Sequence, residues 1–355
     1  MSRNKFGGGE KWMINAAKGL TAAGHNVFLA SKDRSEILAA AKDAGVKTCV
    51  FNIRWDLSPL NTVKIAKFLR KSGIDIVVCN LNKDVRVAGL AARMAGTPAV
   101  IARHGVQLCA IKWRHKLTLT HLTDGILTNT KTIKDAYSQY GWFEDNFVRV
   151  IYNGIEEKSS IQPYDFSEDF PGKKIVFSAG RLTEQKGFRH LIEAAAILGQ
   201  KRDDTIFVIA GKGRLEGQLK KLVNTMGLDD KIHFLGFREN IDSYMTGCDL
   251  FVLPSLFEGM PNVVMEAMAS GKAVVATDVN GARELMVNEE TGIIVPQANP
   301  EALAESIGRL LDDDKLRFDF GQNGRKRVRD HFTVSRMIDQ LEDYFSAMRN
   351  GRIGQ

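Results

Sequence analysis

Short runs of β-branched and aliphatic residues alternate along the chain with longer segments in which apolar residues recur at helical spacing. The strand candidates are residues 26–31, 46–51, 74–79, 99–102, 125–127 and 148–152 in the first half, and 174–178, 205–210, 232–235, 250–253, 273–276 and 292–295 in the second. Strands separated by helix-length segments are typical of parallel sheets with helices on both faces. Two such series predict an α/β protein with two doubly wound, Rossmann-like domains.

The boundary between the two series falls at Tyr152-Asn153-Gly154, where a strand candidate ends in a turn signal. A chain of 355 residues also exceeds the usual size of one hydrophobic core. We expect a first domain over residues 1–155, a polar linker over 156–172 and a second domain over 173–332. An amphipathic pattern predicts a helix over 333–348, within a last segment 333–355 that we expect to pack back on the first domain.

The composition argues against a membrane-spanning, secreted or disulfide-rich protein. Apolar residues make up 44% of the chain, and no run approaches the roughly 18 apolar residues of a membrane-spanning helix. The N-terminus has no apolar signal core. The four cysteines are scattered singly, a spacing of neither a disulfide framework nor a metal site. We therefore expect a cytoplasmic protein.

The charge is uneven, with a net formal charge of +12 in residues 1–155 and −5 in the remainder. A basic half favours an anionic partner, such as a phosphorylated acceptor or the inner face of the plasma membrane. Trp113 stands in a basic stretch from Lys112 to Lys116 that suits such a contact. An incidental basic surface is the alternative. We expect no nucleic acid, because the basic residues lack an interleaved aromatic motif.

The most specific motif has two glutamates, Glu258 and Glu266, with seven residues between them. It follows the strand candidate 250–253 and opens a helix rich in small residues, with Pro261 suited to the first turn. A helix N-terminus at the carboxyl edge of a parallel strand offers N–H groups and a positive dipole end to an anion. One carboxylate can then bind a ribose and the other a sugar ring. Two unrelated surface glutamates are less consistent with this context.

A second motif runs from Ser178 to Gly187, between the strand candidate 174–178 and a helix expected over 188–198. Gly180 permits a tight turn, and Arg181 and Lys186 leave it where a diphosphate would lie. Arginine can clamp phosphate oxygens in a planar fork, and lysine adds a point charge. The alternative is an ordinary strand–helix turn with solvated cations.

Two weaker signals lie in the first half. Gly8 and Gly9 belong to a glycine run ahead of a helix expected over 11–23, where the backbone can approach a phosphate or sugar closely. His104 follows the strand candidate 99–102, again at a carboxyl edge. A flexible terminus and a structural histidine are the respective alternatives. Residues 211–214 lack P-loop spacing, and no His/Cys cluster has metal spacing.

Together these segments resemble the group 1 (family 4) glycosyltransferases, which have the GT-B fold. The resemblance extends from Gly7 to about Phe345, and it implies two Rossmann-like domains facing each other across a cleft. The paired glutamates and the Gly180–Gly187 turn, in this order, are its most specific parts. Further matching pieces are Gly24–Val27, Asn153–Ile155, Phe234–Gly236 and Asp278–Gly292.

The resemblance implies a retaining hexosyltransferase that needs no metal and uses a UDP- or GDP-type sugar donor. Its site residues, carried over by position, are Arg181 and Lys186 for the diphosphate, Glu266 for the ribose, Glu258 with Gly259, Met260, Asn262 and Val263 for the donor sugar and β-phosphate, His104 beside that sugar, and Phe237 and Arg238 beside the base. The expected acceptor is an anionic saccharide or a lipid-linked saccharide of bacterial envelope polysaccharide or lipopolysaccharide synthesis.

One departure from the family concerns the first strand. Family members have an apolar strand just before the glycine run, whereas Met1–Phe6 is not apolar here. We therefore expect the first domain to lack its usual first strand. Two other functions remain open: a sugar-nucleotide epimerase of the same architecture, and a non-catalytic nucleotide-sugar-binding module.

Overall fold

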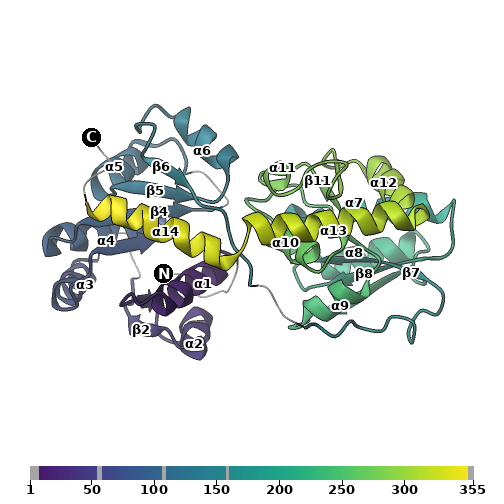
Figure 1. Ribbon diagram of the computed structural model, residues 1–355, viewed down its shortest axis with the longest axis horizontal. Coiled ribbons are helices and arrows are strands. Elements are labelled where there is room, and N and C mark those ends of the chain that lie inside the picture. Colours follow the sequence, from purple (N-terminus) through teal and green to yellow (C-terminus); the bar gives the residue numbers. More distant parts are fainter. Residues whose placement is uncertain (1–7, 54–57, 106–108, 157–159, 351–355) are drawn as a thin grey trace. The chain divides into compact units, whose positions relative to one another are not determined.

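The computed structural model describes residues 8–53, 58–105, 109–156 and 160–350. The chain forms two compact units (Figure 1). The first unit comprises residues 1–154 and 334–355, and the second comprises residues 155–333. Both are α/β, and all pairs of neighbouring strands are parallel.

The elements of the first unit follow the predicted alternation. They are α1 (Gly8–Ala22), β1 (Phe28–Ser31), α2 (Glu36–Asp43), β2 (Lys47–Val50), α3 (Pro59–Lys71), β3 (Ile76–Cys79), α4 (Asn82–Ala95), β4 (Ala99–His104), α5 (Trp113–Leu122), β5 (Gly125–Thr128), α6 (Lys131–Ser138), β6 (Val148–Val150) and α14 (Val334–Arg349). The strands form two sheets, β1-β2 and β3-β4-β5-β6. In the described part of this unit no strand precedes α1.

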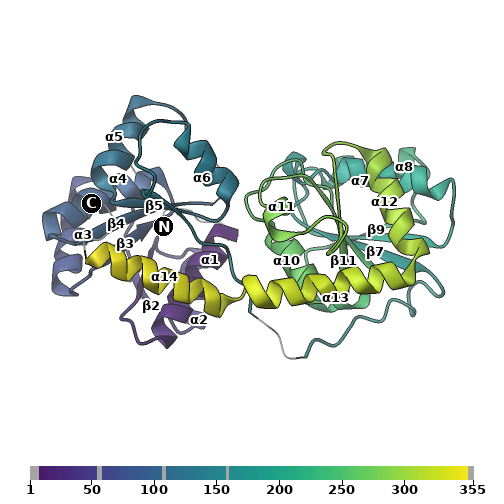
Figure 2. The same cartoon turned by 45° about the horizontal axis from the view of Figure 1, so that its top comes forward.

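Helices cover both faces of the four-stranded sheet in the first unit. One face packs its Ile101 and Leu127 against α1 and α14, while Ala102 and Ile126 on the other face belong to a cluster with α5 and α6 (Figure 2). The predicted C-terminal helix is thus α14, and it packs on α1 within the first unit.

The elements of the second unit build one larger sheet. They are β7 (Lys174–Ala179), the 3₁₀ turn η1 (Glu184–Lys186), α7 (Phe188–Gly199), β8 (Thr205–Ala210), α8 (Glu216–Thr225), β9 (Ile232–Gly236), α9 (Ile241–Gly247), β10 (Leu250–Leu253), α10 (Asn262–Ala269), β11 (Ala273–Thr277), α11 (Ala282–Leu285), β12 (Ile293–Val295), α12 (Pro300–Asp312) and α13 (Asp314–His331). The strand order is β12-β11-β10-β7-β8-β9. The order reverses between β7 and β10, where open α/β sheets bind ligands beyond the carboxyl ends of the strands.

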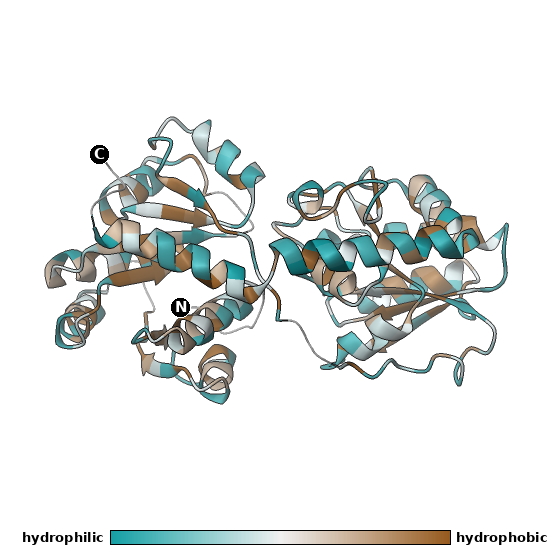
Figure 3. Cartoon of the chain, in the orientation of Figure 1, coloured by the Kyte–Doolittle hydropathy of each residue, from teal (hydrophilic) through white to brown (hydrophobic). Residues whose placement is uncertain are grey.

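The strands of the second unit form its core. β7, β8, β10 and β11 are buried almost throughout, and their side chains pack against α7, α8 and α12. Figure 3 shows the same distribution, with hydrophobic strands inside and hydrophilic residues along the outer side of α13. Near-continuous apolar runs are what parallel strands covered on both faces require.

Short polar side chains fix several helix starts. Ser35 Oγ accepts a hydrogen bond from the Leu38 N–H at the start of α2, and Thr130 Oγ1 accepts one from the Ile133 N–H at the start of α6. Asp313 caps α13 in the same way. Such caps satisfy N–H groups that have no partner inside the helix.

The segment predicted to be a linker packs on the second unit instead. Within its described part, residues 160–172, the ring of Tyr164 stacks on Tyr244 at 4.4 Å between centroids, and Phe166 is buried. Gly247 lies so close to the Tyr164 carbonyl that a Cβ there would overlap it. The prolines and polar residues of this segment favoured a linker, but three of its aromatic side chains pack on the second unit. The third of them, Phe170, lies against the ring of His233.

Candidate active site

The strongest candidate site lies where the strand order of the second unit reverses. The loop after β7 and the loop after β10 leave neighbouring strands at the same sheet edge. The main chain joins them, because the Leu256 N–H donates to the Gln185 carbonyl at 2.8 Å. The Gln185 side chain in turn donates to the Phe257 carbonyl at 2.8 Å.

Gly187 is the closest point of contact between these two loops. Its φ is +61°, and a Cβ there would overlap the carbonyl oxygen of Pro254. Glycine is therefore required both by its conformation and by the space. Gly180 has no such constraint, since a Cβ there would meet only the Lys186 side chain, at 3.4 Å.

Lys186 and Glu258, predicted from separate motifs, meet between the loops after β7 and β10. Lys186 Nζ forms a short ion pair with Glu258 Oε1, and both side chains are largely shielded from solvent. Ser255 Oγ, fully buried, donates to the same carboxylate oxygen at 2.9 Å. The carboxylate thereby holds the ammonium at the sheet edge, and two of the three ammonium protons remain for other acceptors.

Arg181 lies at the start of the same turn. Its side chain is exposed, and the structure gives it no carboxylate partner among the described residues. The Leu182 N–H beside it donates to the Lys212 carbonyl at 3.1 Å, which ties the turn to the loop after β8. Gly211 and Gly213 allow this contact, since a Cβ on either would overlap the backbone of Gly180 or Leu182.

The second glutamate lies on α10, as its motif predicts. α10 begins at Asn262, and Glu266 is half-buried one turn further on. Gly259 and Met260 are buried in the loop between Glu258 and the helix, while Val263 is half-buried. The helix start thus follows directly on the Lys186–Glu258 pair, where its positive dipole end favours an anion.

Phe237 and Arg238 follow β9, two strands away from β7 in the sheet. Both side chains are exposed, Phe237 by 62%. Gly236 has a positive φ of 69°, and a Cβ there would approach the Lys212 side chain at 3.6 Å. The loops after β7, β8 and β9 therefore adjoin in order along one sheet edge, so a ligand bound at this edge can extend toward Phe237.

His104 lies in the first unit at the carboxyl end of β4 and is buried. Its Nδ1 shares a hydrogen bond of 2.5 Å with Tyr137 Oη, and the two rings stack. Tyr137 Oη also accepts from the Cys109 N–H at 3.1 Å. Burial, with smaller effects from Arg103 and His115, lowers the pKa of His104 to about 4, so the ring is neutral near pH 7.

Arg103 precedes His104 and is also buried. Its guanidinium carbon lies 4.1 Å from the centroid of the Trp12 ring, a cation–π arrangement. Burial lowers the pKa of Arg103 to about 10, although nearby Glu10 opposes the shift, so the side chain keeps its charge near neutral pH. Arg103 also donates weakly to Asn153 Oδ1, at 3.5 Å.

The prediction of a glycine loop before the first helix was wrong for Gly8 and Gly9. Both residues form the first turn of α1, which starts three residues earlier than expected. Gly9 is close to Arg103 and Asn80, since a Cβ on it would lie 3.5 Å from Arg103 Nη1. Gly7 lies outside the described residues. Packing against the sheet edge therefore outweighs the low helix propensity of glycine.

Sequence reasoning missed three contributors. Ser255 orients Glu258, Lys212 flanks the β7 turn, and Arg103 places a buried cation at the edge of the other sheet. Each could have been identified from its position in the sequence, because all three lie at or just beyond the carboxyl end of a parallel strand. The second unit brings together Gly180, Arg181, Lys186, Glu258 and the start of α10, whereas His104, Gly8 and Gly9 belong to the first unit.

Two kinds of feature are absent from the described ranges. No group of three or more His, Cys, Asp or Glu side chains there could hold a metal ion. None of the described helices combines the length and apolar character that a bilayer crossing needs.

Comparison with known proteins identifies the family. Residues 161–327 match the family described as Glycosyl transferases group 1, and residues 6–159 match Glycosyltransferase Family 4. A Campylobacter jejuni relative, an N-acetylgalactosamine-N,N'-diacetylbacillosaminyl-diphospho-undecaprenol 4-alpha-N-acetylgalactosaminyltransferase, is 32% identical over 298 residues, which cover 80% of each chain.

Two further likenesses agree. An Escherichia coli UDP-Gal:alpha-D-GlcNAc-diphosphoundecaprenol alpha-1,3-galactosyltransferase is 28% identical over 331 residues, covering 85% of this chain and 83% of the relative. The crystal structure of Anabaena HepE in complex with UDP has a TM-score of 0.86 at 23% identity, over 98% of both chains, and shows the shared fold. The resemblance expected from the motifs is confirmed: the chain belongs to the group 1, family 4 glycosyltransferases and has their GT-B fold.

Proposed function

We propose that this glycosyltransferase moves a hexose-type sugar from a UDP- or GDP-sugar to a lipid-linked saccharide, with retention of anomeric configuration and without a metal ion. The observation that carries the proposal is the Lys186–Glu258 ion pair between the loops after β7 and β10, with Arg181 in the first loop and the start of α10 just after the second. The names of the Campylobacter and Escherichia relatives, both acting on diphospho-undecaprenol-linked sugars, support the acceptor class.

The rate of sugar transfer depends on how well the enzyme stabilises the negative charge that develops on the leaving diphosphate. Breaking the sugar–phosphate bond transfers negative charge to that group, which we place beside Arg181, Lys186 and the positive dipole end of α10. Fixed charges of this kind stabilise the transition state more than the ground state. Glu258 supports Lys186 by pinning its ammonium, and Ser255 fixes Glu258 in turn.

Retention follows if the acceptor hydroxyl attacks from the face that the diphosphate leaves. A phosphate oxygen then accepts the hydroxyl proton, and no protein nucleophile is required. His104, neutral near pH 7, is suited to donate a hydrogen bond to a substrate hydroxyl, or to accept one from it, without adding charge. Glu266 is suited to accept hydrogen bonds from the ribose hydroxyls.

Arg181→Ala tests the role of the crevice. Because Arg181 is exposed, the variant should fold with an unchanged melting temperature. Its turnover with the best donor from a UDP- and GDP-sugar screen should fall about 100-fold, the effect of one positioned charge, roughly 3 kcal/mol.

The matched control for that test is Arg189→Ala. Arg189 is an exposed arginine on α7 that pairs with Glu193, and its loss should leave turnover unchanged. Near-normal turnover in Arg181→Ala would refute the assignment. Product analysis separates the rivals, since an epimerase converts the donor with no acceptor present and a binding module converts nothing.

A surface on the first unit suits a membrane-borne acceptor. Ile111, Trp113 and Leu117, at the start of α5, are 72%, 69% and 48% exposed. Lys112, Arg114 and Lys116 alternate with them and are also exposed. Exposed apolar side chains interleaved with cations are the pattern of an interfacial contact with anionic lipid.

Vesicle binding tests this contact. The chain should bind vesicles of phosphatidylglycerol more strongly than vesicles of phosphatidylcholine, and salt should weaken the binding. Trp113→Ser with Leu117→Ser should reduce it at least 10-fold. Phe318→Ser, which removes a 63% exposed side chain from the second unit, should not change it. If the unchanged chain, the double variant and Phe318→Ser bound the vesicles equally, the α5 surface would not be the membrane contact.

A further inference from the structure

His104 and Tyr137 are both held by regular elements of the first unit. His104 ends β4, where its backbone pairs with Thr128 of β5. Tyr137 lies in the last turn of α6, the helix that follows β5, and its side chain is fully buried. Its ring packs edge-on against Tyr140 and Phe143, at 5.3 and 5.9 Å between centroids. The phenol hydroxyl therefore has a fixed position beside the imidazole, at the sheet edge where α/β units bind ligands.

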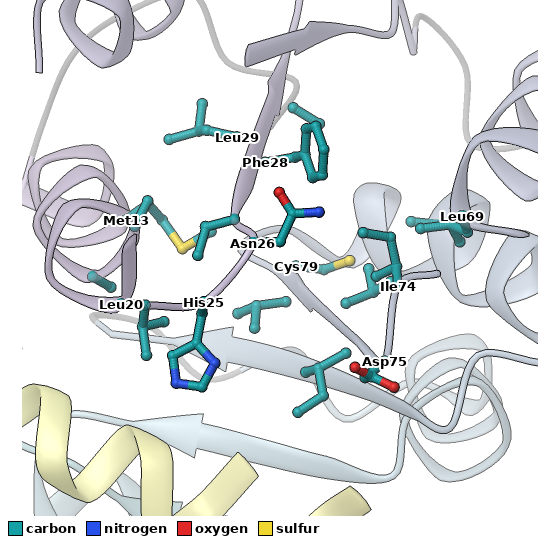
Figure 4. A pocket seen from close by; sticks show the side chains of 18 of the residues that line it. Met13, Leu20, His25, Asn26, Phe28, Leu29, Leu69, Ile74, Asp75 and Cys79 are labelled. Atoms are coloured by element: carbon teal, nitrogen blue, oxygen red, sulfur yellow. The ribbon is translucent and has the colours of Figure 1, made fainter. Parts of the chain in front are cut away.

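An apolar cavity in the first unit does not reach this pair (Figure 4). Its volume is about 400 Å³, and residues of α1, β1, β3 and α14 line it, among them Met13, Phe28 and Cys79. Neither His104 nor Tyr137 is one of its lining residues. The cavity therefore gives solvent no access to the hydrogen bond between these two side chains.

The direction of that hydrogen bond follows from the other contacts of the hydroxyl. Tyr137 Oη lies 2.5 Å from His104 Nδ1 and accepts a hydrogen bond from the Cys109 N–H at 3.1 Å. Burial raises the pKa of Tyr137, so the phenol keeps its proton and needs an acceptor for it. Cys109 Sγ is also within reach, but burial raises the pKa of this thiol, and a thiol sulfur accepts only weakly. The proton of Tyr137 is therefore donated to Nδ1.

This donation fixes the tautomer of the imidazole. Burial lowers the pKa of His104 to about 4, so the ring is neutral near pH 7 and has one N–H and one acceptor nitrogen. Since Nδ1 accepts from Tyr137, the ring proton lies on Nε2. Nε2 makes no hydrogen bond with a described residue, yet it is not one of the fully buried polar atoms that lack a partner. Nε2–H is therefore open to an acceptor atom of a ligand.

Building on the sugar transfer proposed above, we propose that Tyr137 is a positioning residue that fixes His104 as the Nε2–H tautomer, so that the ring donates a hydrogen bond to a hydroxyl or phosphate oxygen of the substrate. Both ring nitrogens are then committed, since Nδ1 accepts from the phenol and Nε2 already carries a proton. His104 therefore cannot take the proton of the attacking acceptor hydroxyl. That proton is left to a phosphate oxygen of the donor.

Nitrogen NMR of the full chain at pH 7, with isotope-labelled histidine side chains, tests the tautomer. The spectrum of His104→Ala, in which one imidazole is missing, assigns the signals of this ring. In the unchanged chain Nε2 should be protonated, and Nδ1 should give the upfield-shifted signal of an imine nitrogen that accepts a hydrogen bond. Tyr137→Phe should remove that Nδ1 signal, because the phenol proton is gone while the aromatic ring remains.

Tyr140→Phe is the matched control for the NMR test. The Tyr140 hydroxyl donates to the Cys109 carbonyl at 2.7 Å, so this variant also removes one phenol contact with Cys109 but keeps the bond to His104. Its His104 signals should match those of the unchanged chain. A protonated Nδ1 in the unchanged chain would overturn the proposal, and so would equal Nδ1 signals in the unchanged chain and in Tyr137→Phe.

A double-variant cycle separates positioning from a merely structural role. With the donor chosen for Arg181→Ala, Tyr137→Phe should lower turnover about 10-fold, because the imidazole loses its fixed orientation. Tyr140→Phe should leave turnover unchanged. In a His104→Ala background, Tyr137→Phe should cause no further loss, since its effect passes through the imidazole. The same loss in both backgrounds, or no loss in either, would overturn the positioning role.

The NMR readout does not depend on sugar transfer. If the spectra of the unchanged chain and of both tyrosine variants were as expected but the chain transferred no sugar, the tautomer assignment would stand and the proposed function would be refuted. The two failures are therefore distinguishable.

Discussion

The backbone of Gly187 has a positive φ of 61° and lies directly against the Pro254 carbonyl. A Gly187→Ala variant must adopt a left-handed conformation and displace the loop after β10. We expect it to lose about 1–3 kcal/mol of stability. Its turnover should fall about 100-fold, because Lys186 and Glu258 would no longer face each other correctly. Thermal denaturation and kinetics measure the two effects.

Gly180→Ala is the matched control at the other end of the turn. Gly180 does not have a positive φ, and its Cβ would be in ordinary contact with Lys186 at 3.4 Å. It should melt within a degree or two of the unchanged protein. If both variants behaved alike, the close approach of Gly187 to β10 would not be what shapes the site.

His104 couples stability to pH. Its pKa is about 4 in the folded chain because of burial, against an ordinary value near 6.5. Between these pH values the unfolded chain binds more protons than the folded chain. The contribution of neutral His104 to the free energy of unfolding is therefore complete above pH 6.5 and is lost as pH falls toward 4. The loss should reach up to about 3 kcal/mol.

His104→Gln should remove this pH dependence. Denaturant titrations at pH 7 and pH 4.5 should show a smaller loss of stability in the variant than in the unchanged protein. Parallel loss in both proteins would mean that other groups control acid stability, and that His104 does not remain neutral in the fold.

At the scale of elements, α1 and α14 pack through a glycine. A Cβ on Gly19 would lie 2.5 Å from Cδ1 and Cγ1 of Ile338, a stiff β-branched side chain. Gly19→Ala should therefore destabilise the chain by about 1–3 kcal/mol, although alanine favours the helix. Adding Ile338→Ala should lessen the clash. Melting curves of the single and double variants measure this.

Gly217→Ala in α8 provides the comparison, since a Cβ there meets nothing within 4 Å. It should stabilise the chain by up to about 1 kcal/mol through helix propensity. A Gly19→Ala variant as stable as Gly217→Ala would show that the two helices are not in close contact.

The elements also show what the sequence could reveal. Period and length predicted each strand within about two residues at either end, because buried parallel strands are almost continuously apolar. The Lys186–Glu258 meeting was predictable in outline, because carboxyl ends of adjacent parallel strands share one edge. The Gly187–Pro254 contact was not, because it joins two loops that are far apart in the sequence. The orienting role of Ser255 was not either, because its hydrogen bond to Glu258, in the same loop, depends on the conformation that this loop adopts. The packing of Tyr164 on Tyr244 is similarly a tertiary effect that local polarity hides.

At the scale of the whole molecule, the chain crosses between its two units twice, at residues 154–155 and 333–334. The first unit is closed by α14, which comes from the far end of the sequence. Each unit has its own apolar core, so each has the means to unfold as a separate cooperative step.

In calorimetry, UDP should therefore raise the melting temperature of one unit and leave that of the other unchanged. The proposed diphosphate ligands Arg181 and Lys186 and the start of α10 all lie in the second unit, so we expect the nucleotide to stabilise that unit by mass action. At about 100 times its dissociation constant the gain is roughly 2.7 kcal/mol, or a rise of about 5–10 °C. Gly19→Ala should lower the other transition, which identifies it as that of the first unit. A single unfolding transition in all samples would contradict the independent unfolding of the two units. If UDP instead shifted the transition that Gly19→Ala lowers, the nucleotide would bind the first unit, which contradicts the proposed chemistry.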